Sequence, residues 1–381
     1  MKAAIQHIIF ILLASVILLA AHYMPPFIEQ NPPLQLIVPA GINLNTQTQA
    51  LTLDHWLDRS YQNTQESFIR DEPYMRALGV RLKNQALFSL FNHNANPKTV
   101  VGPDGYLFDP TYIKAYLGHY NQSDSLFAHR LQQIRQLKAR LDSVGTQLLI
   151  LLPPPKAYVY PEWIPPSYQK LSQQPSDRRK MAEALRNEGI ACMDFDFYRE
   201  LKDNSPALFY PKTGLHWSHY GAFVGLDSLR GTLSRMLGRD LPQLQLDSLH
   251  FTDKPKAPDN ELAVLTNLWG RYPYDSLAYP HYQVRVDSNA YRPKILTVGD
   301  SYYHLWSEFG YLDGLFAEAS QEWFYYGRRF SQAFPKGKGM DKSPAVIQGA
   351  IEEADVLILE ASATNLNRFG FGFLEQYLGS H

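Results

Sequence analysis

The sequence predicts an α/β fold with a mainly parallel sheet covered by helices on both faces, preceded by an N-terminal membrane anchor and a helical stem. Four short apolar runs, at 146–152, 190–195, 294–298 and 355–360, end in polar turns. Parallel strands that are buried on both faces have this continuous apolar pattern. Segments with helical periodicity lie between the runs, and such alternation is typical of a parallel sheet.

The composition excludes some functions. The chain has 381 residues, with 36 Lys+Arg and 37 Asp+Glu, so its formal charge is −1. A protein that neutralises many phosphates needs a basic excess, so we expect no nucleic-acid partner. The single cysteine, Cys192, excludes an internal disulfide and a cysteine-rich zinc site.

The first 24 residues are predicted to be a signal anchor or signal peptide. Lys2 precedes an apolar run over 8–21, which is long enough for a signal-peptide core. Leu18 and Leu19 occupy positions where a cleavage site requires a small residue. We therefore expect an uncleaved or slowly cleaved signal, and a periplasmic or extracytoplasmic protein attached to the cytoplasmic membrane.

Residues 25–95 are predicted to form a tether and a helical stem. The tether, to about residue 49, is rich in Pro, Asn and Gln, and apolar residues over 53–92 recur at helical spacing. Residues 96–381 are then the α/β domain.

Within this domain the elements are expected in the following order. A turn and a short strand occupy 100–108, and an amphipathic helix occupies 124–143. A further helix covers about 176–188. Residues 240–290 are predicted to be irregular and aromatic, forming an insertion or a cover between parts of the sheet.

Ser301 is the candidate nucleophile. In open parallel sheets the ligand site lies beyond the carboxyl ends of the strands, and Gly299-Asp300-Ser301 follows the run 294–298. Amides at the start of the next helix could bind an oxyanion there. Asp and Ser are also common helix N-caps, so this motif alone is weak.

His216 is the candidate base, because a nucleophilic serine needs a base within hydrogen-bonding distance. His304 is only one helical turn from Ser301, a spacing that rarely aligns a base. His216 and His219 could also suggest a metal pair, but no third ligand has convincing spacing. We therefore expect neither a metal ion nor an organic cofactor.

Several motifs together resemble the SGNH-hydrolase-like proteins of the alginate O-acetyltransferase family. They are Gly299-Asp300-Ser301, Leu215-His216-Trp217 and the segments 101–108 and 152–162. In that family the histidine motif precedes the Gly-Asp-Ser block, as it does here, and the likeness covers roughly residues 96–370. The resemblance implies a three-layer domain with Ser301 as nucleophile and His216 as base. It also implies acetylation of polysaccharide hydroxyls beside a membrane-bound O-acyltransferase that supplies the acetyl group.

One position departs from the family pattern. The family usually has an Asp two residues before the histidine, where this chain has Gly214. A catalytic histidine needs an acceptor that fixes its tautomer. Asp194, Asp196 or Glu360 could supply it, and so could a backbone carbonyl, or the site could be inactive.

Four further residues, Lys156, Tyr302, Asn365 and Arg368, are predicted to bind substrate. Lys156 follows a strand end and three prolines, where it would hold a substrate carboxylate or be a solvated charge. Asn365 and Arg368 follow the last strand, where polar residues are often only turn formers.

The sequence thus predicts an O-acetyltransferase or acetylesterase acting on an exported or cell-envelope polysaccharide. Transfer and hydrolysis share an acyl-enzyme, so the residues do not distinguish them. The alternative is a non-catalytic, membrane-tethered subunit that binds or assembles polysaccharide, and Gly214 is its main support.

Overall fold

The structure, a computed structural model, describes residues 52–63, 73–268, 272, 275–324, 328–331 and 343–379. The chain divides into two compact units. One is Met1–Asn96 with Ala263–Tyr272, and the other is Pro97–Leu262 with Pro273–His381. The predicted signal over 1–24 lies outside the described residues. Among those that are described, no helix is long and apolar enough to cross a membrane.

The described part of the first unit includes the helices α2 (Leu53–Leu57) and α4 (Pro73–Phe91). Both fall in the stretch predicted to be helical. Asn84 on α4 donates a hydrogen bond to the Thr266 carbonyl at 2.8 Å, which joins α4 to the segment 263–272 of the same unit.

The second unit is built on a six-stranded sheet. Its strands, in spatial order, are β4 (Cys192–Met193), β3 (Gln147–Leu151), β10 (Val356–Glu360), β7 (Ile295–Gly299), β8 (Gln321–Phe324) and β9 (Arg328–Ser331). The first five are parallel, and only β9 is antiparallel to its neighbour. The four apolar runs in the sequence are the four neighbouring strands β4, β3, β10 and β7, so this prediction is confirmed.

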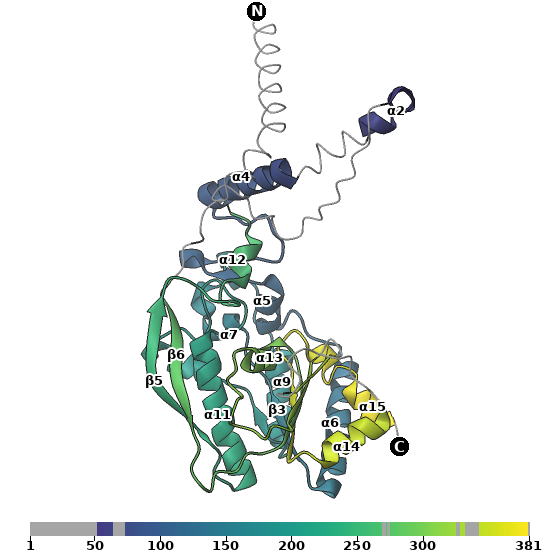
Figure 1. Ribbon diagram of the computed structural model, residues 1–381, viewed down its shortest axis with the longest axis vertical. Helices are drawn as coiled ribbons and strands as arrows, with labels where there is room; N and C mark the ends of the chain where they lie inside the picture. The colour runs from purple at the N-terminus through teal and green to yellow at the C-terminus, as the bar shows by residue number, and fades with distance from the viewer. Residues whose placement is uncertain are drawn as a thin grey trace, which may run out of the picture. The chain divides into compact units, whose positions relative to one another are not determined.

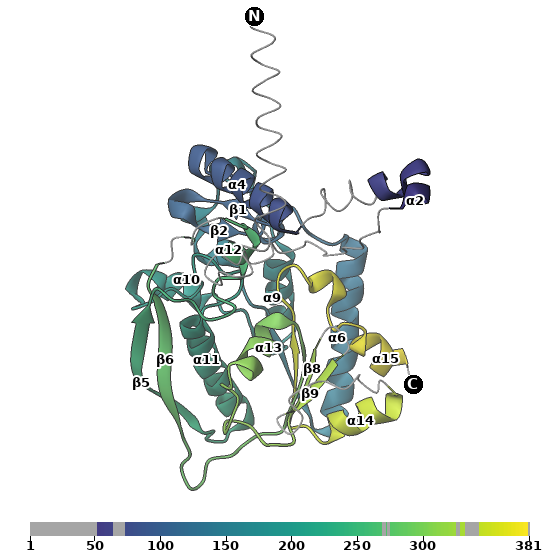
Figure 2. The same ribbon diagram turned by 45° about the horizontal axis from the view of Figure 1, so that its top comes forward.

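Helices cover both faces of the sheet, which explains why the strands are apolar throughout. One face packs against α6 (Asp124–Val144), α9 (Asp177–Asn187), α14 (Pro344–Glu352) and α15 (Phe373–Gly379). The other packs against α10 (Phe197–Leu201), α11 (His219–Leu237) and α13 (Ser301–Glu308). Figure 2 shows α6, α14 and α15 on one side of the sheet and α11 on the other. Successive residues of β3 alternate between the two cores, with Leu148 in one and Leu149 in the other.

Short elements surround the carboxyl ends of the strands. The predicted turn and strand near 100–108 form a small hairpin of β1 (Val100–Val101) and β2 (Leu107–Phe108). Phe108 packs in a third apolar cluster with residues of α5 (Pro110–Tyr116) and α7 (Lys156–Val159). The remaining short helices here are η2 (Pro103–Gly105), η3 (Pro161–Trp163), α8 (Pro166–Gln169), η4 (Lys202–Asn204) and η5 (Leu366–Arg368).

The region 240–290 is not irregular, and that prediction was wrong. It contains a long antiparallel ribbon of β5 (Gln243–Thr252) and β6 (Leu277–Arg285), which lies beside α11 (Figure 1). A bulge between Leu246 and Ser248 interrupts the period-two pattern of β5, and Pro280 lies within β6. Both features weaken the sequence pattern of a strand, but both are tolerated in a ribbon whose strands are edges. The short helix α12 (Glu261–Leu265) lies between the two strands in sequence.

Candidate active site

Ser301 is the first residue of α13 and directly follows the turn after β7. Asp300 caps this helix, because its Oδ1 accepts a hydrogen bond from the Tyr302 amide at 3.0 Å. Gly299, the last residue of β7, allows β10 to approach closely. A Cβ at this position would lie 2.9 Å from Glu360 Oε2 and 3.3 Å from Glu360 Cβ. The sequence therefore needs a glycine here to place the serine at the sheet edge.

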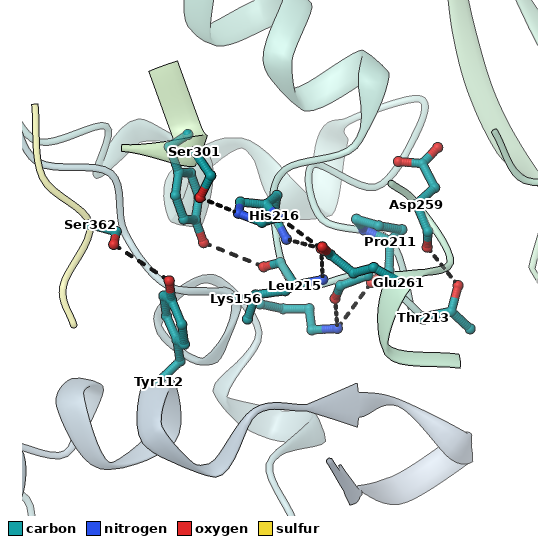
Figure 3. A network of polar contacts seen from close by, with 12 residues as sticks. Tyr112, Lys156, Pro211, Thr213, Leu215, His216, Asp259, Glu261, Ser301 and Ser362 are labelled. Carbon is teal, nitrogen blue, oxygen red and sulfur yellow. Dashed lines mark hydrogen bonds and ion pairs between the residues drawn. The ribbon is translucent and has the colours of Figure 1, made fainter. Parts of the chain in front are cut away.

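His216 lies within hydrogen-bonding distance of Ser301. The imidazole Nε2 is 2.7 Å from Ser301 Oγ, although 85 positions separate the two residues (Figure 3). His216 comes from the loop that precedes α11, and its exposed fraction is 9%. The structure thus brings together the two residues that the sequence singled out.

The acceptor on the far side of the imidazole is Glu261, which the sequence analysis did not identify. Glu261 Oε1 lies 2.8 Å from His216 Nδ1 (Figure 3). The same oxygen accepts the backbone N–H of Leu215 at 2.8 Å and that of His216 at 3.1 Å. A carboxylate only accepts, so Nδ1 donates to Glu261, and the neutral imidazole can accept the Ser301 hydroxyl proton at Nε2.

The acids proposed from the sequence have other partners, so those assignments are corrected. Asp194 pairs with Arg186, and Asp196 pairs with Arg178 at 2.6 Å. Glu360 Oε2 accepts the Asp300 amide at 2.7 Å. Strand and helix ends fix these three carboxyl groups away from the imidazole, and the connection between β5 and β6 brings in Glu261 instead.

The histidine and the glutamate change each other's pKa. Burial of the imidazole acts to lower the pKa of His216, but the charge and hydrogen bond of Glu261 outweigh it, so the pKa is raised. For Glu261, burial acts to raise the pKa, and the interaction with His216 and the two backbone N–H groups lowers it. Both shifts favour an ionised carboxylate beside a histidine that holds a proton well.

Lys156 supports the histidine loop and is not placed to bind substrate, which corrects that prediction. Its side chain is buried, and Nζ donates to the carbonyls of Pro211, Lys212 and Gly214 at 3.0, 3.3 and 2.6 Å. The ammonium has three N–H donors, so these three carbonyls use all of them. Burial lowers the pKa of Lys156 to about 7.

Tyr302 is also buried rather than available to substrate. Its hydroxyl donates to the Leu215 carbonyl at 3.3 Å, and its ring packs edge-on against the His216 ring with 4.8 Å between centroids. The residue therefore packs beneath the histidine, and its prediction as a substrate contact is corrected.

A polar network joins the turn before Ser301 to the loop after β10. Asp300 Oδ2 accepts hydrogen bonds from the Ser362 amide at 2.9 Å, the Ser362 hydroxyl at 2.7 Å and Asn365 Nδ2 at 2.6 Å. Tyr112 on α5 lies 3.4 Å from the Ser362 hydroxyl. Burial raises the pKa of Glu360 well above its usual value, and the nearby charge of Asp300 adds to the effect.

Asn365 and Arg368 belong to the same loop. Arg368 Nη2 donates to Asn365 Oδ1 at 2.8 Å, so Asn365 connects the exposed Arg368 to the buried Asp300. Both lie after the carboxyl end of β10, the neighbour of β7, and their contact with substrate stays a prediction.

The His219 side chain packs among other residues than the His216 side chain does. Its Nδ1 lies 3.3 Å from the Tyr311 hydroxyl, and its ring stacks on Phe309. Burial lowers the pKa of His219 to about 4. Among the described residues, no group of three or more His, Cys, Asp or Glu side chains is arranged to hold a metal ion.

A serine at a strand-to-helix turn, in line with a histidine and a carboxylate at the carboxyl edge of a parallel sheet, defines an α/β domain of the serine-hydrolase type. Comparison with known protein families identifies the family of this domain. Residues 99–328 match the model of the family described as "SGNH hydrolase-like domain, acetyltransferase AlgX", and the chain belongs to this family.

Two curated relatives from Pseudomonas have the name "Probable alginate O-acetylase AlgJ". That of Pseudomonas putida is 26% identical over 200 residues, which are 51% of this chain and 48% of the relative. That of Pseudomonas aeruginosa is 28% identical over 173 residues, or 45% of this chain and 40% of the relative. The chain thus spans half or less of the length of these curated relatives.

The comparison with solved structures returns, among others, the O-acetyltransferase domain of Pseudomonas putida AlgJ and Pseudomonas aeruginosa AlgX. The AlgJ domain aligns with a TM-score of 0.46 and 18% identity, over 75% of this chain and 100% of that structure. AlgX aligns with a TM-score of 0.46 and 16% identity, over 73% of this chain and 67% of that structure.

Proposed function

We propose that this protein is an O-acetyltransferase that works through an acetyl-serine at Ser301. The observation that carries this proposal is the line of contacts from Glu261 through His216 to Ser301, with separations of 2.8 and 2.7 Å. These are the distances that a working nucleophile, base and orienting acid require.

In the first half of the reaction, Ser301 Oγ attacks the carbonyl carbon of an acetyl donor. Its proton passes to His216 Nε2 as the new C–O bond forms. Collapse of the tetrahedral intermediate breaks the bond to the leaving group, which takes that proton from the imidazolium. Glu261 stabilises the imidazolium through the Nδ1 hydrogen bond and prevents the ring from turning.

In the second half, the acetyl group passes to a hydroxyl of the acceptor. His216 Nε2 removes the hydroxyl proton while the oxygen attacks the acetyl carbonyl, and the Ser301–acetyl bond breaks. The serine oxygen regains its proton from His216. If water replaces the acceptor, the same steps hydrolyse the acetyl group, so the enzyme must favour the sugar over water to act as a transferase.

The negative charge of the tetrahedral intermediate needs hydrogen-bond donors. The Ser301 amide is in the first turn of α13, where N–H groups have no acceptor within the helix. This amide, with the positive end of the helix dipole, is our candidate for stabilising the oxyanion.

We propose an exported or cell-envelope polysaccharide as acceptor and a membrane-bound O-acyltransferase as the source of acetyl groups. The names of the Pseudomonas relatives, probable alginate O-acetylases, support an acidic polysaccharide. The apolar segment over 8–21 supports a location outside the cytoplasmic membrane, attached through the N-terminus.

The test is acetyl transfer by the purified full-length chain from p-nitrophenyl acetate to an oligosaccharide acceptor. Mass spectrometry of the intact protein should detect an acetyl group on Ser301, and mass spectrometry of the acceptor should detect its acetylated form. Ser301→Ala should abolish both signals. If the wild-type chain neither forms acetyl-serine nor releases acetate, the non-catalytic polysaccharide-binding subunit becomes the better description.

A further inference from the structure

A cleft separate from Ser301 lies at the carboxyl ends of β3 and β4. It has a volume of about 880 Å³. Its lining includes four arginines, Arg178, Arg179, Arg186 and Arg199, and three acidic residues, Glu183, Asp194 and Asp196. Arg178 fixes the cleft to the sheet, because Nη1 donates to the carbonyls of Leu152 and Asp194, which follow β3 and β4.

The arginines of this cleft are not equivalent. Arg178 pairs with Asp196, and Arg186 pairs with Asp194, so the charges of these two are balanced. Arg179 and Arg199 are exposed and form no ion pair with any residue in the described part of the chain. A guanidinium presents planar donors that match a carboxylate, and two such groups on one cleft favour an anionic ligand.

The rest of the lining suits a sugar. Tyr158 presents its ring to two arginines, with Arg178 4.5 Å and Arg199 5.1 Å from the ring centroid. Tyr116 packs edge-on against Tyr158, and both rings line the cleft. The side-chain amides of Gln173 and Gln174 also line the cleft and can bind hydroxyl groups.

The cleft and Ser301 are on the same edge of the sheet. Asp194 and Asp196 follow β4, Ser301 follows β7, and β3 and β10 lie between these two strands. Three strand spacings separate the two strands, or about 14 Å. A single sugar cannot occupy both places, but a chain of several sugar units can.

We propose that this cleft is a remote subsite that binds a carboxylate-bearing stretch of the acceptor polysaccharide through Arg179 and Arg199. The proposal rests on the function proposed above and specifies its acceptor as an acidic polysaccharide. Binding in the cleft holds the polymer on the enzyme while a hydroxyl several units away lies at Ser301.

Binding is measured with the full-length chain carrying Ser301→Ala, so that the result does not depend on turnover. The probes are polygalacturonate, which bears carboxylates, dextran, which is neutral, and dextran sulfate, which bears another anion. The Arg179→Gln and Arg199→Gln double variant should bind polygalacturonate roughly tenfold more weakly, since each lost contact is an exposed charge pair whose contribution is reduced by solvent screening. Arg235→Gln is the matched control, because this exposed arginine is on α11, on the opposite face of the sheet from α9.

Chain length gives a second, independent readout on the active enzyme. The double variant should raise KM for a long polygalacturonate acceptor several-fold more than KM for a disaccharide, which cannot span the two places. Equal binding of dextran and polygalacturonate, or unaltered binding by the double variant, would overturn the proposal. Equal binding of dextran sulfate would overturn the assignment of a carboxylate ligand. Absence of acetyl transfer by the wild-type chain would instead refute the proposed function, because the binding experiment does not require it.

Discussion

Glu261 and His216 are joined by more than one hydrogen bond. The oxygen that accepts from the imidazole Nδ1 at 2.8 Å also accepts the backbone N–H of His216 itself at 3.1 Å. One carboxylate oxygen therefore orients both the ring and the backbone of the candidate base. This arrangement fills the place left by Gly214, where an Asp two residues before the histidine was expected from the family pattern.

Ser301→Ala and His216→Ala should each reduce acetyl transfer by on the order of 10³-fold or more, and the double variant should lose little beyond that. Residues that act in one catalytic unit are non-additive. Single-turnover transfer measures the effect, with Ser143→Ala at the exposed end of α6 as control. Losses that multiply in the double variant would mean that the two residues act separately.

Glu261→Gln should lower kcat by about 10²- to 10⁴-fold, the usual range for a disturbed acid–base catalyst. The reaction requires a neutral His216, and Glu261 raises the pKa of that imidazole. As the pH is lowered, wild-type activity should therefore begin to fall at a pH above the ordinary histidine pKa. In the variant this acidic limb of the pH profile should move to lower pH. The pH profile of kcat/KM gives the result. An unmoved limb would show that Glu261 does not control His216.

Gly214→Asp should reduce activity rather than restore a family feature. A Cβ at this position would lie 2.5 Å from Pro211 Cγ and 3.1 Å from the Asp259 carbonyl oxygen. Overpacking of this kind costs about 1–3 kcal/mol, and here it displaces the loop that carries His216. Gly214→Ala should show a smaller loss of the same kind. A gain in activity with Asp would mean that the wild-type histidine lacks a good orienting acid.

Lys156→Met should lower the free energy of unfolding by about 2–4 kcal/mol, because it removes the ammonium that hydrogen-bonds the Gly214 carbonyl at 2.6 Å, whereas the Lys212 carbonyl keeps the Leu107 N–H. The displaced histidine loop should also reduce kcat. Lys138→Met is the matched control, since Lys138 forms an i,i+4 ion pair with Asp142 on the surface of α6 and contributes about 0.5 kcal/mol or less. Denaturant titration and initial rates measure the two effects. Similar behaviour of both variants would contradict the role assigned to Lys156.

Glu360→Gln should make stability less dependent on pH. Burial raises the pKa of this carboxyl group above its value in the unfolded chain. Above the unfolded pKa, the folded state therefore keeps a proton that the unfolded state has lost. The free energy of unfolding of the wild type should then decrease with rising pH in that range. Gln keeps an acceptor for the Asp300 amide and does not titrate. Denaturant titrations from pH 5 to pH 8 compare the slopes, and identical slopes would argue that Glu360 is ionised.

The central strands could be predicted from the sequence because burial on both faces leaves an unambiguous apolar run. Ser301 could be found because its motif follows a strand end, and His216 because a nucleophilic serine needs a base; both motifs also resemble those of a known family. The β5–β6 ribbon could not be found, since the bulge after Leu246 and the position of Pro280 disturb strand periodicity. The polar residues that precede the apolar positions of α12 are a local signal for the start of a helix. They do not indicate that Glu261 contacts the histidine.

The roles of Glu261 and Lys156 could not be predicted from the sequence for a different reason. Glu261 is 45 positions from His216, and only the path of the ribbon connection brings it to the imidazole. Lys156 was predicted to meet substrate, yet its acceptors are backbone carbonyls of Pro211, Lys212 and Gly214. Backbone groups do not vary with sequence, so a partner of this kind leaves no pattern to read.

The position of β10 has a consequence for how the chain folds during synthesis. This strand comes last in the sheet by sequence, yet it pairs on one side with β3 and on the other with β7. Until residues 356–360 leave the ribosome, β3 and β7 have no common neighbour, and each presents an unpaired edge that can join another chain. Pairings over such long sequence separations also form slowly. A nascent chain arrested before β10 should therefore already contain Ser301, His216 and Glu261 and still need chaperone protection, with activity arising only after the last strand is inserted.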